Sequence, residues 1–404
     1  MPAAENPEVE LSIVMPCLNE AETLAVCVEK ALNGLKSAGI FGEVIVADNG
    51  STDGSIEIAQ KNGARVVNVT TKGYGNALRG GIEAAKGRWI IMGDADDSYD
   101  FGEAGRFMEK LREGHDLVMG CRLPKGGGTI KPGAMPWKNR WIGNPSLSFI
   151  GRLFFKTPVR DFHCGLRGFS RDAYDRMELK TTGMEFASEM VMKASLRSMR
   201  ISEVPITLHP DGRSRPPHLR PWRDGWRHLR FMLIYSPRWL FLVPGLVLTL
   251  IGSLAAAWIF LAPRHIGGIE FDAGSLLVAC MGAIIGIQLV AFACFTKAFA
   301  ITEGLLPEDP KFAKALRLIT LERGLITGVL ICLGGAGMLA WSVYLWSQVN
   351  FGSLPYPENL RRIILAVALI VIGLQTVFSS FFLGVLGLKT NAENSRRDAR
   401  LLRQ

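Results

Sequence analysis

The sequence predicts an α/β domain followed by four transmembrane α-helices. The chain has 404 residues, which is more than one compact core usually holds. Hydrophobic residues make up 48% of it although 21% are charged, so the apolar residues should be concentrated in one part. After residue 238, four segments without charged residues exceed the roughly 18 apolar residues that are typical of a membrane-spanning helix.

Residues 11–122 alternate short apolar runs with amphipathic segments of helical length, which is the pattern of a parallel α/β sheet. We expect strands at LSIVM, EVIVADN, ARVVNV, RWIIMGDAD and DLVMGCR. We expect helices between them at residues 20–37, 55–61, 75–86 and 102–113. Ligands collect at the carboxyl ends of the strands in such sheets, so the residues directly after each strand are the candidates for chemistry.

A Gly/Pro-rich segment at residues 123–135 predicts a flexible loop, either a lid or a plain connection. Beyond it, residues 222–235 place arginines opposite aromatic and aliphatic residues, as a helix lying on a membrane surface does. The predicted organisation is a soluble domain (1–221), an interfacial amphipathic helix (222–238), a membrane domain (239–388) and a basic tail (389–404). The predicted spans are residues 239–261, 274–295, 324–346 and 363–388.

Basic residues near the spans predict the orientation, because cytoplasmic flanks retain Lys and Arg. Nine arginines lie between Arg197 and Arg238, and further basic residues lie in the second connection and the tail. The outer connections carry only Arg264, Arg361 and Arg362. Because the first ten residues are acidic and resemble no signal peptide, we expect the soluble domain to be cytosolic.

The net charge of +9 is concentrated beside the predicted membrane spans. This favours an anionic lipid surface over nucleic acid as the partner of the basic residues. The seven cysteines are scattered singly, without the spacing of a zinc site or a disulfide framework. We interpret them as reduced packing residues.

Two aspartates, Asp94 and Asp96, follow the strand RWIIMG. Alternation along an extended chain points both carboxylates to the same side, about 6 to 7 Å apart. Such a pair suits Mg²⁺ or Mn²⁺, which takes one or two carboxylates from a protein and its other ligands from phosphate and water. An Asp-x-Asp pair alone is more often part of a turn or a helix cap than a metal site. The residues around the pair must therefore distinguish these interpretations.

Polar residues also follow the neighbouring strands. Asp48 lies in VIVADNGSTDGS, where a carboxylate can accept hydrogen bonds from a base or a ribose. Asn19 and Glu20 follow the first strand, where Asn19 is alternatively a helix N-cap. The turn KGYGNALR places Gly75 and Asn76 at a helix N-terminus, which favours a diphosphate. We therefore expect three strand ends to face one ligand.

These motifs resemble glycosyltransferase family 2. The segments that carry the resemblance are VMPCLNEAETL, VIVADNGSTDGS, GYGNALRGGIEAAKG, MGDADDSYDF, GCR and HCGLRGFS. Their order is similar to that of the polyprenyl-phosphate glycosyltransferases, a group that includes the dolichol-phosphate mannose synthases. The resemblance covers residues 11–235 and implies a GT-A nucleotide-diphospho-sugar transferase fold and an inverting, single-step transfer.

The resemblance also implies site residues. Asp94 and Asp96 would hold the metal ion. Many relatives have a Gln two positions after the second aspartate as a further metal contact, whereas this chain has Ser98, so Asp97 or water would complete the metal's coordination. The implied donor-binding residues are Pro16, Asn19, Glu20, Asp48, Asn49, Gly75, Asn76, Asp94, Ala95 and Asp96.

For the acceptor, the resemblance implies a lipid-phosphate site made of Arg122, Arg140, Asn144, Arg213 and Arg215. Arginine suits this role because its fork of N–H groups matches phosphate oxygens. For each single arginine, a contact with solvent or with lipid headgroups is an equally good interpretation.

A phosphate acceptor is already anionic near neutral pH, since its second pKa is about 6, so a dedicated general base is not required. Asp96 is a catalytic candidate through the metal ion, and Asp161 and Glu189 are candidates because family members place acidic residues near the acceptor. The alternative for Asp161 and Glu189 is a structural ion pair with Arg160, Arg167 or Lys193.

The sequence thus predicts transfer of glucose or mannose from a UDP- or GDP-sugar to a polyprenyl phosphate, dolichyl or undecaprenyl, at the cytosolic face of a prokaryotic inner membrane. A processive polysaccharide synthase should contain Gln-x-x-Arg-Trp, and this chain does not. An enzyme acting on protein or soluble sugar would not need four spans, whereas a glycolipid acceptor stays open as an alternative. A non-catalytic scaffold would not be expected to keep Asp48, Asp94 and Asp96. Lipid length and a homo-oligomeric state stay open.

Overall fold

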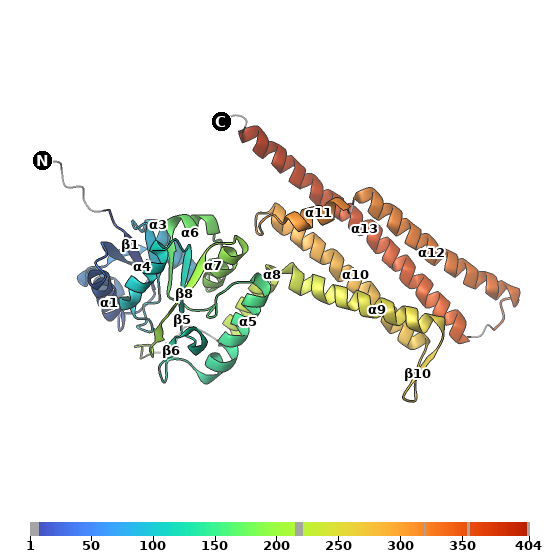
Figure 1. Ribbon diagram of the computed structural model, residues 1–404, viewed down its shortest axis with the longest axis horizontal. Helices are drawn as coiled ribbons and strands as arrows, with labels where there is room; N and C mark the ends of the chain where they lie inside the picture. Colours follow the sequence, from blue (N-terminus) through green and yellow to red (C-terminus); the bar gives the residue numbers. More distant parts are fainter. Residues whose placement is uncertain (1–7, 215–220, 319, 354–355, 402–404) are drawn as a thin grey trace. The chain divides into compact units, whose positions relative to one another are not determined.

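The computed structural model describes residues 8–214, 221–318, 320–353 and 356–401 (Figure 1). The chain divides into two compact units, Met1–Met232 and Leu233–Gln404. The division falls within helix α8 (Pro221–Ile234), in the segment for which the sequence predicts an interfacial helix. Each unit is described separately below.

A seven-stranded sheet forms the centre of the first unit, in the order β3-β2-β1-β4-β7-β5-β8. β1, β2, β3 and β4 run parallel to one another, and β5 pairs in parallel with β8. The strands are β1 (Leu11–Cys17), β2 (Gly42–Asp48), β3 (Arg65–Asn68), β4 (Trp89–Met92), β5 (Leu117–Cys121), β7 (Arg167–Ser170) and β8 (Ile201–Pro205).

All five strands predicted between residues 11 and 122 are present and run in the same direction, but the sheet also contains β7, which was not predicted. β7 lies between β4 and β5 and is antiparallel to both. Arg167 at its start is fully buried, so this short strand has none of the apolar pattern by which the others were predicted.

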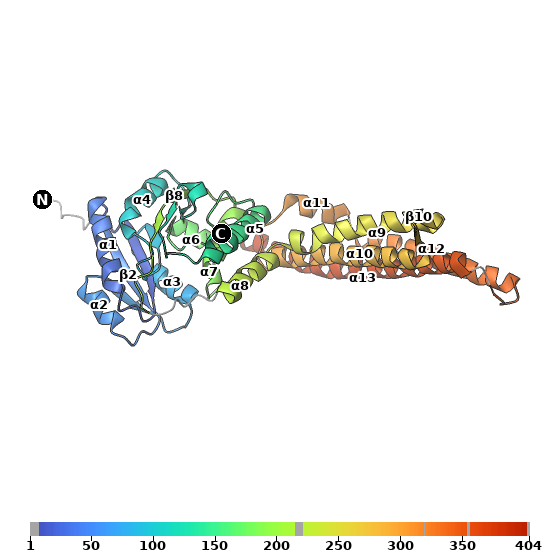
Figure 2. The same cartoon turned by 90° about the horizontal axis from the view of Figure 1, so that it is seen from below.

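Helices cover both faces of the sheet (Figures 1 and 2). On one face α3 packs so closely on β1 that a Cβ at Gly81 would lie 2.5 Å from Val14. On the other face Phe107 and Leu111 of α4 lie against Gly168 of β7, and α1 contacts α4. The helices are α1 (Leu24–Ser37), α2 (Ser55–Lys61), α3 (Tyr74–Ala84), α4 (Ala104–Arg112), α5 (Asn144–Phe155), α6 (Arg171–Met177) and α7 (Glu185–Leu196).

The Gly/Pro-rich segment is held by the rest of the unit. β6 (Thr129–Ile130) pairs in parallel with β9 (Thr207–Leu208), and the Thr129 N–H donates to the Ile206 carbonyl over 3.0 Å. A Cβ at Gly128 would lie 2.1 Å from the Cys121 carbonyl oxygen, so the glycine permits a close backbone approach. Of the two interpretations of this segment, a plain connection fits better than a lid for its first half, which is hydrogen-bonded to the rest of the unit.

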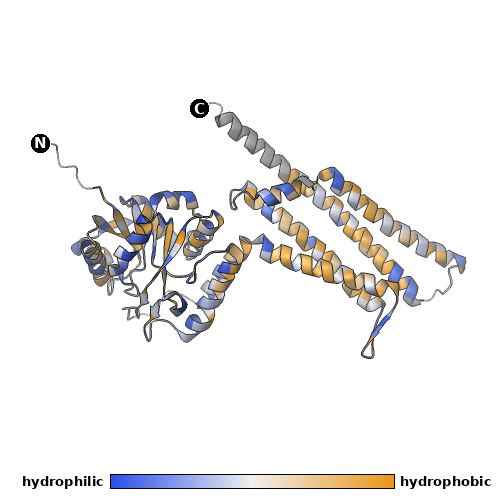
Figure 3. Cartoon of the chain, viewed as in Figure 1, coloured by the Kyte–Doolittle hydropathy of each residue, from blue (hydrophilic) through white to orange (hydrophobic). Residues whose placement is uncertain are grey.

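The second unit contains four helices that are long and apolar enough to cross a membrane, as predicted (Figure 3). The candidate spans are Arg238–Leu261, Ala273–Thr302, Leu321–Gln348 and Glu358–Leu386. They belong to α9 (Val243–Leu261), α10 (Ala273–Thr302), α12 (Leu321–Gln348) and α13 (Tyr356–Leu401). A hairpin of β10 (Arg264–Ile266) and β11 (Ile269–Phe271) joins α9 to α10, and α11 (Pro310–Leu318) precedes α12.

Small residues allow these helices to pack closely, as is usual where lipid supplies no hydrophobic driving force between helices. A Cβ at Gly252 of α9 would lie 2.7 Å from the Ala279 carbonyl oxygen of α10. A Cβ at Gly335 of α12 would lie 2.7 Å from the Ala366 carbonyl oxygen of α13. Two helix pairs, α9 with α10 and α12 with α13, are therefore tightly joined.

The structure pairs Arg361 and Arg362, which the predicted orientation places on the outer side, each with a carboxylate. Arg361 donates to Asp272 at 2.6 Å, and Arg362 lies 3.9 Å from Glu358. These contacts offset positive charge on that side of the unit.

Candidate active site

The loops after β1 and β2 are joined into one structure by hydrogen bonds. The Asn19 side-chain oxygen accepts from the Thr52 N–H over 2.8 Å, and the Glu20 N–H donates to Ser55 Oγ over 3.0 Å. Asn19 has a left-handed backbone (φ 58°), whereas Thr23 is the residue that precedes α1. The alternative interpretation of Asn19 as a helix N-cap is therefore wrong, because its side chain bridges two loops.

Asp48 and Asn49 are both buried at the end of β2. The Asp48 carboxylate accepts from the N–H groups of Gly50 and Ser51 at 2.9 and 3.2 Å. The Asn49 amide donates to the Val69 carbonyl at 2.8 Å and accepts from the Gly73 N–H at 2.8 Å. These bonds fix the shape of the turn and tie it to the start of α3.

The start of α3 is covered by another part of the chain. A Cβ at Gly75 would lie 2.9 Å from the backbone of Thr182, and the Asn76 N–H donates to the Thr182 carbonyl over 3.2 Å. The Asn76 side chain donates to the Lys72 carbonyl. Gly75 and Asn76 therefore serve close packing, and the predicted diphosphate site at this helix N-terminus is not supported.

Asp94 and Asp96 follow β4 in the loop that faces the ends of β1 and β2. The Tyr74 hydroxyl donates to Asp94 Oδ1 at 2.9 Å. Burial, and secondly the charge of Asp96, raises the pKa of Asp94 to about 6. Two carboxylates held this close repel each other, so a cation between or beside them is favoured.

Ser98, the departure from the family pattern, bonds to Asp96 itself. Its hydroxyl and its N–H both donate to Asp96 Oδ1, at 2.5 and 3.1 Å. Asp97 instead pairs with Lys30 at 2.7 Å, so it does not complete the coordination of a metal at Asp94 and Asp96. Ala95, between Asp94 and Asp96, is buried, and its carbonyl accepts a hydrogen bond from the Thr23 hydroxyl at 2.6 Å.

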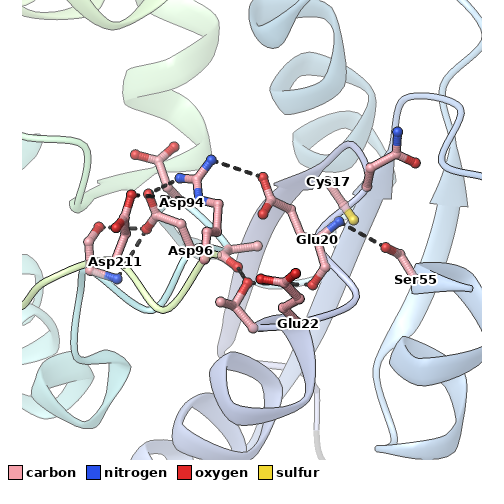
Figure 4. Close-up of polar contacts among 12 residues, drawn as sticks. Cys17, Glu20, Glu22, Ser55, Asp94, Asp96 and Asp211 are labelled. Atoms are coloured by element: carbon pink, nitrogen blue, oxygen red, sulfur yellow. Dashed lines mark hydrogen bonds and ion pairs between the residues drawn. The ribbon is translucent and has the colours of Figure 1, made fainter. Parts of the chain in front are cut away.

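Arg213 lies between carboxylates from two loops, those of Glu20 and Asp96. Figure 4 shows these two carboxylates. Its guanidinium donates to Glu20 Oε1 at 3.3 Å and also to Asp96 Oδ2. Only 9% of its side chain is exposed. The Gly212 N–H donates to the Asp96 carbonyl, which holds this segment on the aspartate loop. Arg215 lies outside the described residues.

The structure joins two residues that the sequence analysis treated separately. Asp161 is fully buried, and both of its oxygens accept from the Arg122 guanidinium, at 2.7 and 2.8 Å. Asp161 therefore forms a structural ion pair, with Arg122 in place of the partners named from the sequence. Arg122 also lies 3.4 Å from the Tyr99 hydroxyl, which accepts from the Gly165 N–H at 2.9 Å.

Glu189 is buried in a second structural ion pair. It contacts Lys193 at 2.9 Å, and its oxygens accept from the N–H groups of Lys180 and Thr181 and from the Thr181 hydroxyl. Of the two interpretations of Glu189, the ion pair with Lys193 is the one found. Its role is to hold the segment that precedes Thr182, which covers α3.

Arg140 lies in a π-helical turn (Asn139–Gly143), and Asn144 is the first residue of α5, which follows that turn. Their contacts are local: Arg140 stacks over Trp141 at 5.4 Å, and the Asn144 amide lies 3.2 Å from Met135 Sδ. Within the described residues, Arg140 Nε is buried and has no hydrogen-bond partner. Pro16 lies within β1, in register with Ala47 of β2.

Sequence reasoning missed Tyr74, Tyr99 and Lys72. Lys72 Nζ donates to the Asn49 carbonyl at 2.6 Å, and the two tyrosines bond to Asp94 and Arg122. Tyr99 lies in DSYD, directly beside the aspartate pair, and Tyr74 lies in the GYGN turn. Their adjacency to the polar motifs was the available signal.

The residues present fit a divalent metal ion that is bound by protein carboxylates and by phosphate oxygens of a substrate. Among the described residues there is no group of three or more His, Cys, Asp or Glu side chains able to hold a metal. Asp94 and Asp96 supply two carboxylates, which is the number that Mg²⁺ or Mn²⁺ takes when phosphate and water complete its coordination. Burial is the largest cause of the raised pKa of Asp94, and the charge of Asp96 adds to it.

The chain is similar to known glycosyltransferases. The family model described as glycosyl transferase family 2 matches residues 12–177, and that of the glycosyltransferase family 2 C-terminal transmembrane region matches residues 294–387. The low-salt glycan biosynthesis hexosyltransferase Agl6 of Haloferax volcanii is 41% identical over 384 residues, which cover 93% of this chain and 89% of the relative.

Two further similarities are more distant. A dolichyl-phosphate hexose transferase of Haloferax volcanii is 29% identical over 201 residues, covering 49% of this chain and 82% of that protein. A glucosyl-3-phosphoglycerate synthase from Mycobacterium tuberculosis, solved with Mn²⁺, UDP and its product, is 20% identical, with a TM-score of 0.42 over 56% of this chain and 77% of that chain. By the match to Agl6 along nearly the whole chain and by both family models, this protein is a glycosyltransferase with a C-terminal transmembrane region and belongs to glycosyltransferase family 2.

Proposed function

We propose that this enzyme transfers one hexose, glucose or mannose, from a UDP- or GDP-sugar to a polyprenyl phosphate in an inverting reaction that needs Mg²⁺ or Mn²⁺. The observation that carries the donor half is the convergence of Asp94, Asp96 and Arg213 where β1, β2 and β4 end. Relatives named as a hexosyltransferase and a dolichyl-phosphate hexose transferase support the choice of sugar class and acceptor.

On the donor side, Asp94 and Asp96 would hold the metal ion, which supplies positive charge against the leaving nucleoside diphosphate. Ser98 keeps the Asp96 carboxylate oriented by bonding to one of its oxygens, and Tyr74 does the same for Asp94. Arg213 holds Asp96 and Glu20, and its guanidinium is the group that would turn to the diphosphate. Asp48 lies at the adjacent strand end, where the base or ribose would bind.

On the acceptor side, no side chain needs to remove a proton, because a phosphate monoester is already ionised near neutral pH. The burial of Asp161 and Glu189 in ion pairs is consistent with this. The unpartnered Nε of Arg140 is a suitable donor for the acceptor's phosphate. Asn144, the first residue of α5, directly follows the π-helical turn that contains Arg140.

A lipid acceptor is further supported by apolar side chains that the first unit leaves in solvent. Trp137, Trp141 and Phe149, on α5 and the turn before it, are 65%, 60% and 58% exposed. Tryptophan beside basic residues is typical of a surface that lies in the headgroup layer. With the predicted orientation of the spans, this layer would be the cytosolic face of a prokaryotic inner membrane.

The test is to incubate membranes containing the full-length protein with a panel of radiolabelled nucleotide-sugars and a polyprenyl phosphate, and to extract the lipid. We expect label from one UDP- or GDP-hexose in the lipid fraction. Label that appears only in polymer or protein would refute the lipid-phosphate acceptor. Full activity in Asp96→Ala would refute the metal assignment.

A further inference from the structure

A short segment after β9, residues 209–214, lies against the loop that holds the two aspartates, and we call it the strap. The His209 N–H donates to the Ser98 carbonyl, and the Gly212 N–H donates to the Asp96 carbonyl, each over 3.0 Å. Both bonds join backbone to backbone, so they do not depend on the charge of a side chain. The strap is therefore fixed to the aspartate loop at its start and in its middle.

The end of the strap is fixed by a carboxylate from a different loop. Ser214 donates twice to Glu22: its N–H donates to Oε2 at 2.7 Å, and its hydroxyl donates to Oε1 at 2.5 Å. Glu22 lies in the loop after β1, two residues beyond Glu20 and just before α1 begins at Leu24 (Figure 4). The strap thus bridges the loop after β4 and the loop after β1.

Arg213 lies within the strap, between these fixed points. Its guanidinium contacts Asp96 and Glu20, and 9% of its side chain is exposed. Within the described residues, Arg213 Nε is shielded from solvent and has no hydrogen-bond partner, and the carboxylate oxygen of Asp211 lies 4.0 Å from it. A buried donor without an acceptor raises the free energy of the folded state, so this N–H gains from an incoming phosphate oxygen.

We propose that Glu22 is a positioning residue for the transferase reaction: by holding Ser214 it keeps the strap closed and so presents Arg213 to the metal and diphosphate site. The inference rests on the proposed function, because Asp96 is proposed there as a metal ligand. With the strap closed, Arg213 opposes a metal ion at Asp96 but is already in place for a diphosphate. Loosening the strap should therefore change the affinities for metal and for nucleotide in opposite directions.

The deciding variant is Ser214→Ala, which removes the hydroxyl bond to Glu22 without changing the net charge. Binding is measured on the purified full-length protein in detergent. Without nucleotide, Mn²⁺ should bind roughly threefold more tightly than to wild type, because Arg213 leaves Asp96 more easily. With saturating Mn²⁺, UDP or GDP, whichever binds the wild type, should bind roughly threefold more weakly. A loss of folding alone would weaken both.

Two further variants match this one. Ser214→Thr keeps the hydroxyl and should restore both affinities. Ser37→Ala removes a hydroxyl bond at the end of α1, away from the strap, and should bind both probes as wild type. In an Arg213→Ala background, Ser214→Ala should no longer change the Mn²⁺ affinity, since Glu22 acts through Arg213.

Glu22→Ala removes both bonds to Ser214 and should shift the two affinities in the same directions as Ser214→Ala. The loss of a negative charge would by itself weaken the binding of a cation and strengthen that of an anion, which is the reverse. Glu29→Ala, on the exposed side of α1, removes an equal charge and should show only that reverse effect. Hydrogen exchange of the Ser214 amide should be faster in Glu22→Ala and unchanged in Glu29→Ala.

Three results would overturn the proposal: affinities for Mn²⁺ and nucleotide that are both unchanged or shift in the same direction in Ser214→Ala, an effect of Ser214→Ala that persists without Arg213, or unchanged exchange of the Ser214 amide in Glu22→Ala. If neither Mn²⁺ nor a nucleotide binds to the wild type, the proposed function fails. The exchange measurement then decides by itself whether Glu22 holds the strap.

Discussion

Replacing Arg213 by alanine should make the metal site easier to fill. The Arg213 guanidinium donates to one oxygen of Asp96 and contacts Glu20 at 3.3 Å. A metal ion at Asp96 must compete with that guanidinium. The variant removes the competitor and leaves the carboxylates in place.

The magnitude follows from the contact that is lost. A hydrogen bond to a charged group contributes about 1.5–3 kcal/mol, and breaking the one between Arg213 and Asp96 opposes metal binding by about that amount. Without it, the enzyme should bind Mn²⁺ at least roughly tenfold more tightly in the absence of nucleotide. The metal-free variant should also unfold more easily, because a largely buried ion pair has lost one partner.

The assay is thermal unfolding of the full-length protein in detergent at increasing Mn²⁺ concentration, from which the metal affinity follows by linkage. Lys30→Ala is the matched control. It removes one positive charge from the same region, but Lys30 pairs with Asp97 and not with Asp96. We expect Lys30→Ala to change the Mn²⁺ affinity far less. Arg213→Ala should at the same time raise the KM for the nucleotide-sugar.

Unchanged or weaker Mn²⁺ binding by Arg213→Ala would contradict this account of the site. It would mean that the guanidinium and the metal do not share Asp96. An equal gain in Arg213→Ala and Lys30→Ala would reduce the effect to net charge alone.

Three further substitutions test other parts of the structure. Asp161→Asn removes the charge that is paired with Arg122 in the core and should destabilise the protein by about 3 kcal/mol in thermal or denaturant unfolding; a general base would instead lose turnover at normal stability. Tyr74→Phe removes the bond to the Asp94 carboxylate and should lower turnover by roughly tenfold, measured at saturating donor; wild-type turnover would show that the bond does not orient the carboxylate. Gly335→Leu should push α12 away from α13 and lower the midpoint temperature of unfolding. Gly337→Leu is the control and should leave the midpoint unchanged, because no atom lies within 4 Å of its Cβ position. Equal midpoints for the two variants would contradict the observed packing.

The grouping of polar residues that we propose as the donor half of the site could be predicted because these residues follow buried strands. Each apolar run of β1, β2 and β4 ends in polar residues, and parallel strands bring such ends to one edge of the sheet. The four candidate spans could also be predicted from the sequence, since length and lack of charge are sufficient to identify them.

Long-range pairing was not accessible in the same way. β7 could not be predicted because Arg167 is buried by donating to backbone carbonyls, such as that of Cys164 at 2.8 Å, and this leaves no hydrophobic pattern. Arg122 and Asp161 lie 39 residues apart, and nothing in their local sequences indicates that each is the other's partner. Gly75 looked like a phosphate-binding glycine because the segment that covers it, at Thr182, comes from a distant part of the chain.

The most direct test of the central claim is mass spectrometry of the lipid product made by the purified full-length enzyme. The enzyme is reconstituted in a bilayer with polyprenyl phosphate, Mn²⁺ and the nucleotide-sugar that the labelling panel identifies. The account predicts a lipid phosphate that carries one hexose, and no such product from Asp96→Asn or after removal of the metal. Sugar found on protein or in a polymer, or the same lipid product from Asp96→Asn, would contradict it.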